Sequence, residues 1–288
     1  MESANAYEWN LQQAEKYMGL KKLRIVIWCG AAANQKALAN KITAQFEVAG
    51  IVIDTHSGKK GKNKLFNLPA ILWDRFRFRT IYYAWGNLMK YYEGKFLHWP
   101  DVAKIEVSNI NNKETEQFTR ELQPDLIVVS GTALIKEPLL SIPVSMGIIN
   151  LHTGLSPYVK GGPNCTNWCI ANNTFQLVGN TIMWLNAGID TGNIITTATV
   201  DIKNAKDLNE AHRVVMKHAH ELYLKSIDYL SETEPPYNSV PQNSLGNGQL
   251  YLTKMWTTAR KKDLLKNWKK RKHFISNEIP KTISLRTG

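Results

Sequence analysis

The chain has 288 residues, 43% of them hydrophobic, which is enough for one large domain or for one domain with a small appendage. This composition excludes a fibrous or disordered protein, and no apolar run reaches the ~18 residues that a membrane span needs. The net charge of +12 is concentrated in one segment, because residues 254–273 hold nine Lys or Arg against one Asp, which is +8. A second Lys cluster lies earlier in the chain, at 59–64. Local charge indicates an anionic partner, such as nucleic acid, a phosphorylated metabolite or an anionic membrane, or else a solvated face.

The N-terminal segment is polar and lacks the apolar stretch of a secretory signal. Three cysteines, Cys29, Cys165 and Cys169, are an odd and small number for this length, which argues against a disulfide framework. We therefore expect reduced cysteines and a cytoplasmic location.

Hydrophobic patterns predict the elements in chain order. A helix is expected over 6–18, in an N-terminal extension of residues 1–21. Strands are expected at 23–30, 48–54, 103–109, 125–131, 147–152, 177–185 and 193–202. Helices are expected at 34–46, 85–92, 113–122 and 208–230, with Asn112 and Asp207 as N-caps. Strands that alternate with helices from 23 to 152 predict an α/β fold with a Rossmann-like, mostly parallel sheet and flanking helices.

The C-terminal part reads as a small appendage. After the helix at 208–230, a Pro pair and the Asn247-Gly248 turn predict a linker and a β-hairpin, and a basic helix follows. We expect three parts, namely the extension 1–21, a catalytic domain 22–205, and a C-terminal helix, hairpin and basic tail 206–288. The histidines of the long helix, His212, His218 and His220, are not spaced as ligands on one face, which favours a solvated surface.

Several familiar sites are missing. The first strand ends in a single Gly30 without a GxGxxG pattern, so no dinucleotide is expected, and there is no GxxxxGK[ST] phosphate loop. Cys165 and Cys169 have no His near them at zinc spacing, and we expect no metal. A nucleophilic Cys165 with His152 as its base is an open alternative, although a lone cysteine is more often simply buried.

The strand at 147–152 ends with two polar residues, Asn150 and His152, and a loop rich in Gly, Pro and Ser follows. Residues two apart on a strand point to the same side, and parallel α/β sheets bind ligands beyond the carboxyl ends of their strands. An amide can donate to a developing oxyanion, and a histidine can move a proton near neutral pH. Asp190, between glycines after a later strand, can orient His152.

These segments resemble the folate-dependent formyltransferase family. The family signature is Asn-x-His, a loop of the Ser-Leu-Leu-Pro-x-Tyr-Arg-Gly type and then Asp-Thr-Gly. Here the loop reads GLSPYVKG (154–161), and DTG begins 38 residues after His152. The resemblance covers roughly residues 22–205. Two departures are Lys160, where Arg is common, and the segment 80–100, which has no counterpart in the shared pattern.

The resemblance implies formyl transfer from 10-formyltetrahydrofolate, a cosubstrate, to a primary amine. By position, Asn150, His152 and Asp190 match the catalytic triad, with His152 accepting a proton, Asn150 holding the oxyanion and Asp190 raising the basicity of His152. The implied cofactor-binding residues are Ala133, Leu134, Ile135, Asn186, Gly188 and Asp190. The loop over folate and acceptor implies substrate binding by Ser156, Pro157, Tyr158, Lys160 and Gly161.

The acceptor depends on the C-terminal part. Only 58 residues follow Leu230, too few for the OB-like barrel that the tRNA enzymes of the family add. The resemblance therefore favours a sugar N-formyltransferase, a homodimer that acts on a nucleotide-linked amino sugar for lipopolysaccharide O-antigen biosynthesis. Methionyl-tRNA or a carrier-bound aminoacyl group remains an alternative acceptor. A further alternative is a non-catalytic nucleic-acid-binding protein that uses the basic segment with Trp256 and Trp268.

Overall fold

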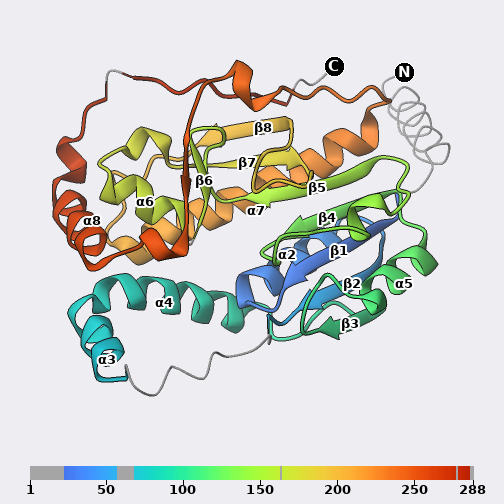
Figure 1. Ribbon diagram of the computed structural model, residues 1–288, viewed down its shortest axis with the longest axis horizontal. Coiled ribbons are helices and arrows are strands. Elements are labelled where there is room, and N and C mark those ends of the chain that lie inside the picture. Colours follow the sequence, from blue (N-terminus) through green and yellow to red (C-terminus); the bar gives the residue numbers. More distant parts are fainter. Residues whose placement is uncertain (1–22, 57–67, 163, 277, 286–288) are drawn as a thin grey trace, which may run out of the picture.

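A seven-stranded sheet, in the order β3-β2-β1-β4-β5-β7-β8, runs through the molecule (Figure 1). The computed structural model describes residues 23–56, 68–162, 164–276 and 278–285. The strands are β1 (Ile25–Gly30), β2 (Val48–Asp54), β3 (Lys104–Val107), β4 (Leu126–Ser130), β5 (Gly147–His152), β7 (Gly179–Trp184) and β8 (Ile194–Thr199). The strands from β3 to β5 are parallel, and β7 and β8 are antiparallel, so the predicted mostly parallel sheet is confirmed. The predicted helix at 6–18, the extension 1–21 and the Lys cluster at 59–64 lie outside the described residues.

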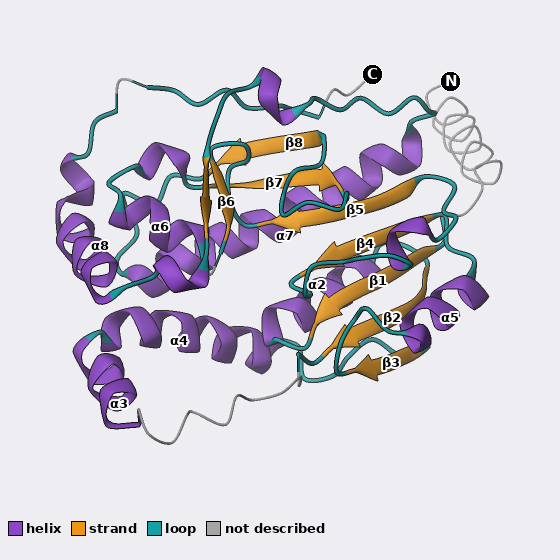
Figure 2. Cartoon of the chain, in the orientation of Figure 1, coloured by secondary structure: helices purple, strands orange, loops and turns teal. Residues whose placement is uncertain are grey.

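Helices flank this sheet, as the sequence predicts (Figure 2). They are α2 (Ala33–Thr43), α3 (Leu68–Arg77), α4 (Arg79–Lys95), α5 (Lys113–Leu122), α6 (Cys165–Ala171), α7 (Leu208–Glu232) and α8 (Thr258–Lys270). Both predicted N-caps are confirmed, since the Asn112 side chain accepts from the Thr115 N–H and the Asp207 side chain from the Glu210 N–H, each at 2.8 Å. The segment 80–100, with no counterpart in the family pattern, lies mostly in α4, which is longer than the predicted helix 85–92 and follows α3 directly.

Residues of β1 alternate between two hydrophobic clusters, one on each face of the sheet. Ile25 and Ile27 belong to the cluster that α2 and α7 cover, whereas Val26 and Trp28 belong to the cluster on the opposite face, which α5 and the chain after β4 cover. Both faces of the sheet are therefore buried, which explains why its parallel strands read as continuous apolar runs.

Helix α7 packs on the main sheet, across the predicted boundary between 205 and 206. The buried Tyr223 hydroxyl accepts from the Val129 N–H at 2.8 Å and lies 2.9 Å from the Ile149 carbonyl, which ties α7 to β4 and β5. The prediction of a solvated surface for the α7 histidines is wrong for two of them, because His212 and His220 are buried. The spacing carried this signal: His212 lies four residues after Leu208, on the apolar stripe.

The predicted C-terminal hairpin does not form. Strand β9 (Gln249–Tyr251) pairs in parallel with β6 (Val159–Gly161), the strand of the loop after β5. Gly248 instead lies against the loop after β5. A Cβ built on it would come 1.8 Å from the Pro157 carbonyl oxygen. The Asn-Gly pair therefore marks a close approach of two distant segments.

Two further C-terminal segments cover the edge of the sheet at β8. Val240 forms an antiparallel bridge with Ile194, and the Ile283 carbonyl accepts from the Thr197 N–H at 2.8 Å. An edge strand would otherwise expose unpaired backbone groups. The C-terminal part thus pairs with the main sheet at β8 and with the loop after β5 at β6.

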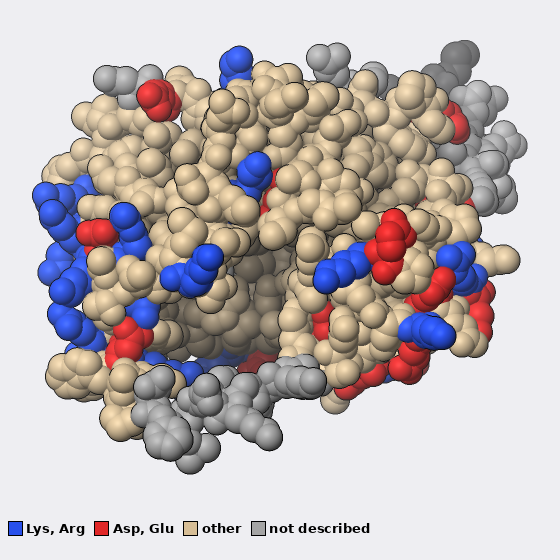
Figure 3. Space-filling view, in the orientation of Figure 1, with Lys and Arg blue, Asp and Glu red and all other residues tan. Residues whose placement is uncertain are grey.

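Helix α8 carries the basic segment and contacts the α3–α4 unit. The Lys261 ammonium donates to the Asp74 carboxylate at 2.5 Å and to the Tyr82 hydroxyl at 3.1 Å. Lys and Arg side chains gather on the α8 side of the surface in Figure 3. In the part of the chain that the structure describes, no helix has the length and apolar character of a membrane span.

Candidate active site

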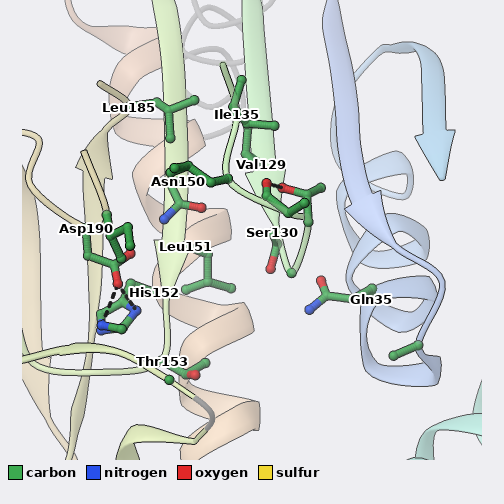
Figure 4. A pocket seen from close by; sticks show the side chains of 18 of the residues that line it. Gln35, Val129, Ser130, Ile135, Asn150, Leu151, His152, Thr153, Leu185 and Asp190 are labelled. Carbon is green, nitrogen blue, oxygen red and sulfur yellow. Dashed lines mark hydrogen bonds and ion pairs between the residues drawn. The ribbon is translucent and has the colours of Figure 1, made fainter. Parts of the chain in front are cut away.

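A cavity of about 560 Å³ opens at the carboxyl ends of β1, β4 and β5, the edge at which parallel α/β sheets bind ligands. The face of the molecule in Figure 3 is hollowed near its centre. The lining residues include Gln35 of α2, Ser130 of β4 and Asn150 of β5, and Figure 4 shows these side chains around one space. The predicted location of the site at the strand ends therefore coincides with a real cavity.

His152 and Asp190 contact each other on one side of this cavity (Figure 4). The Nδ1 atom of His152 lies 3.3 Å from Asp190 Oδ2, and its Nε2 atom lies 3.0 Å from the Val159 carbonyl oxygen. A carbonyl oxygen and a carboxylate can only accept hydrogen bonds, so both contacts are satisfied when both ring nitrogens carry a proton. The geometry therefore favours an imidazolium.

The electrostatics agree with this geometry. His152 is only 7% exposed, and burial by itself lowers its pKa because it penalises the charged ring. The Asp190 carboxylate, the Cys165 side chain and the Val159 carbonyl oppose burial and raise the pKa of His152 to about 10. At neutral pH the His152 ring is thus a buried imidazolium.

The loop that carries Asp190 is held from two sides. Asp190 itself has a left-handed backbone, with φ of 50°, and its Oδ2 accepts the Gly161 N–H at 2.8 Å. The buried Gln242 side chain donates to the carbonyls of Asp190 and Gly192, each at 2.8 Å. The position of the carboxylate against His152 therefore depends on both the loop after β5 and the C-terminal segment.

The predicted cofactor-binding residues fall into two groups. Ala133, Leu134, Ile135, Gly188 and Asp190 line the cavity together with Asn150 and His152. Asn186 is absent from the described lining, since its side chain shapes the loop by accepting from the Gly188 N–H at 3.1 Å and from the Thr191 hydroxyl at 2.7 Å.

Most of the predicted substrate-binding residues do not reach this cavity. Only Gly161 lines it among the described residues, and Pro157 and Lys160 line a separate depression with the C-terminal segment. Ser156 is buried, and its N–H donates to the Thr181 hydroxyl at 2.9 Å. The Tyr158 hydroxyl accepts the Lys281 N–H at 2.9 Å. The loop after β5 therefore anchors the C-terminal segments, and substrate binding by these four residues stays a prediction.

Comparison with known proteins agrees with this geometry. The profile of the family described as Formyl transferase matches residues 25–227, the span that holds the sheet, the cavity and the His152–Asp190 pair. The chain belongs to the formyl transferase family. The match ends within α7, which agrees with the packing of that helix on the sheet.

The relatives of this formyl transferase family member differ in their acceptors. A methionyl-tRNA formyltransferase of Clostridium beijerinckii is 39% identical over 124 residues, which are 42% of this chain and 39% of that protein. The chain thus spans well under two thirds of that relative's length. A sugar N-formyltransferase of Shewanella sp FDAARGOS_354 is structurally similar, with a TM-score of 0.50, 18% identity, and coverage of 86% of this chain and 88% of the other. A 4-N formyltransferase of Francisella tularensis has a TM-score of 0.50, 19% identity, and coverage of 85% and 88%.

Several residues that line the cavity of this protein were not predicted from the sequence. Tyr251, Leu252 and Thr253 of the C-terminal segment line it, as do Trp85 of α4 and Met216 of α7. Another missed residue, Asp54, is fully buried and accepts the Ala133 N–H at 3.1 Å, which fixes the chain that follows β4. A carboxylate at the end of an apolar strand was a usable signal for Asp54, whereas no local pattern marked the C-terminal residues.

Cys165 lies close to His152 but does not face the cavity. Its sulfur is 3.6 Å from His152 Nε2 and donates to the Gly161 carbonyl at 3.4 Å. Cys165 is buried and is absent from the described lining. Its arrangement is that of a packed thiol rather than an accessible nucleophile. Among the residues that the structure describes, no three His, Cys, Asp or Glu side chains form a metal-binding group.

Proposed function

We propose that this protein transfers the formyl group of 10-formyltetrahydrofolate to a primary amine, with Asn150, His152 and Asp190 at the reacting centre. The observation that carries the proposal is the buried His152–Asp190 pair at the cavity beside Asn150, within a formyl transferase family chain. Polar side chains at the end of a rigid strand are suited to such chemistry because their positions are fixed before the substrates arrive.

The cosubstrate fits the character of the cavity. Val129, Leu134, Ile135 and Leu185 offer apolar side chains, which suit a flat pterin ring, and the exposed backbone near Gly188 offers polar groups for its edge. We propose that these residues, with Ala133 and Asp190, hold 10-formyltetrahydrofolate. When bound, it supplies the activated formyl group.

The charge state of His152 refines the proton path expected from sequence. Asn150 donates to the formyl oxygen as the amine attacks the formyl carbon, and the positive charge of the nearby His152 imidazolium stabilises the oxyanion that forms. His152 then gives a proton to the departing folate nitrogen and recovers one from the attacking amine. The carbon–nitrogen bond to folate breaks, the new amide bond remains, and His152 ends in its starting state.

For the acceptor, we propose a nucleotide-linked amino sugar, formylated in the cytoplasm by a homodimer and used for a surface polysaccharide such as an O-antigen. The structural likeness to a sugar N-formyltransferase supports a sugar amine. Methionyl-tRNA is the second candidate, because curated relatives are methionyl-tRNA formyltransferases and α8 presents a basic surface that suits phosphates.

A single set of assays separates these possibilities. Purified protein is mixed with 10-formyltetrahydrofolate and either amino-sugar nucleotides or methionyl-tRNA, and the formylated product is measured by mass spectrometry. His152→Ala should bind 10-formyltetrahydrofolate but lose formyl transfer by at least about 10³-fold, since both proton transfer and oxyanion stabilisation are lost. Near-wild-type turnover of that variant would contradict the proposed chemistry, and product from methionyl-tRNA alone would contradict the sugar acceptor.

A further inference from the structure

A second cavity of about 500 Å³ adjoins the candidate active site. The two cavities share Trp85, Thr153 and Met216 as lining residues, and Thr153 directly follows His152. A ligand whose reacting end lies at His152 can therefore extend into this second cavity and stay in contact with the protein along its length.

The walls of the second cavity come from parts of the chain far apart in sequence. Tyr82 and Trp85 belong to α4, in the segment outside the family's shared pattern, and Trp256 belongs to the C-terminal segment before α8. The described lining consists only of Ile81, Tyr82, Trp85, Thr153, Asn164, Thr166, Asn167, His212, Val215, Met216 and Trp256. Lys, Arg, Asp and Glu are absent from these described residues, so the cavity suits an uncharged group.

Two buried polar side chains lack a partner in this cavity. Asn167 is 8% exposed and His212 is 3% exposed, and neither the Oδ1 atom of Asn167 nor the Nε2 atom of His212 has a hydrogen-bond partner among the described residues. Buried polar atoms are rarely left unpaired, because they lose their water without compensation. Burial lowers the pKa of His212 to about 4, so its ring is neutral at pH 7.

Aromatic rings surround these two polar groups. The Trp85 and His212 rings meet edge to face at a centroid distance of 6.1 Å, and Trp256 packs against Trp168 of α6 at 4.8 Å. Aromatic faces bind flat rings by stacking, and an amide with a neutral imidazole can pair with the polar edge of such a ring. The cavity thus combines aromatic surface for stacking with two polar atoms, Asn167 Oδ1 and His212 Nε2, that have no hydrogen-bond partner among the described residues.

We propose that the second cavity is the acceptor-recognition subsite and binds an uncharged, polar-edged ring of the acceptor. This inference rests on the proposed function, since it deepens the account of the substrate. The ring is either the base of a nucleotide-linked acceptor or its sugar, since both offer a face that packs on an aromatic ring and an edge of polar groups. Asn167 and His212 bind the edge, and Trp85 supplies the face.

The contact between α8 and the α3–α4 unit gives this subsite a fixed wall. Lys261 of α8 donates to Asp74 of α3 and to Tyr82 of α4, and Tyr82 also lines the subsite. Asp74 further accepts the Tyr82 hydroxyl proton at 2.5 Å. The basic helix therefore acts on acceptor binding by positioning α4, in addition to any contact with phosphate.

The test is direct binding by isothermal titration calorimetry, with thymidine, uridine and glucosamine as separate probes. The wild-type protein should bind at least one nucleoside or the sugar, and the probe that binds identifies which ring fills the subsite. Asn167→Ala and His212→Leu should each weaken that binding by about tenfold or more, because each removes a hydrogen bond to the ring edge. Tyr83→Ala is the matched control, since Tyr83 lies on α4, is 65% exposed and is absent from the described lining.

Folding and folate binding are measured in the same samples. Thermal melting identifies any variant that fails to fold, and Trp85→Leu provides a third variant on a partly exposed side chain. If the wild type binds no probe at millimolar concentration, or if all the variants bind as the control does, the subsite is overturned. Binding of 10-formyltetrahydrofolate tests the proposed function separately. If the wild-type protein does not bind it, formyl transfer is contradicted, whereas the ring-binding subsite is not.

Discussion

Replacing Asp190 with Asn tests the charge state of the reacting centre. Asn is nearly isosteric and tolerates the left-handed backbone at this position, so the loop should keep its shape. The replacement removes the carboxylate that lies 3.3 Å from His152 Nδ1, and burial then dominates. The pKa of His152 should fall from about 10 to its ordinary value or below.

This change has a calculable effect on folding stability. A pKa of about 10 in the folded protein against ~6.5 in the unfolded chain stabilises the fold by ~4 kcal/mol at pH 7. Because the folded pKa is the higher one, this stabilisation is complete below about pH 6.5 and is lost as the pH rises through about 10. The difference in stability between wild type and Asp190→Asn should therefore shrink from ~4 kcal/mol at pH 7 to under ~1 kcal/mol at pH 10.

Urea unfolding of both proteins at pH 6.5, 8 and 10 measures this difference, and ¹⁵N chemical shifts of the imidazole report the protonation of His152 directly. Formyl transfer by Asp190→Asn should fall by at least about 10²-fold at pH 7, because the neutral ring cannot stabilise the oxyanion as a cation does. A pH-independent stability difference, or a neutral His152 in the wild type at pH 7, would refute the assignment of the imidazolium.

Three other changes test the supports of the site. Gln242→Ala should cost ~1–3 kcal/mol in urea unfolding and lower turnover, because it frees two carbonyls of the Asp190 loop. Gly248→Ala should loosen the β6–β9 pairing and raise the KM for folate, since its Cβ would clash with the Pro157 carbonyl. Tyr223→Phe should lower the free energy of unfolding by ~1–3 kcal/mol, because it removes the hydroxyl that links α7 to the buried backbone of the sheet. The pH dependence of formyl transfer should not change.

Each of these changes has a control or a contrary outcome. Gly94→Ala lies in α4 in open space and should leave stability unchanged or raise it by up to ~1 kcal/mol. If Gly248→Ala behaves like Gly94→Ala, the close approach of β9 to the loop after β5 does not hold the cavity. Unchanged turnover and stability in Gln242→Ala would remove the C-terminal segment from the support of Asp190.

The sequence alone determined the sheet and predicted the centre of the candidate site. Continuous apolar runs gave β1, β2, β4 and β5 because both faces of these strands are buried, and this pattern is local. Asn150 and His152 were predictable as a pair because residues two apart on a strand share a side. Asp190 was predictable from its position between glycines after an apolar strand.

The tertiary structure decided which distant segments complete the site. Gln242 reaches the Asp190 loop from 52 residues away, and Tyr251 lines the cavity because β9 pairs with β6 rather than with a neighbour in sequence. The protonation of His152 likewise depends on burial and on three groups that the fold brings to its ring. Local patterns encode which residues are buried and which turns form, but contacts across a long loop depend on the path of the whole chain.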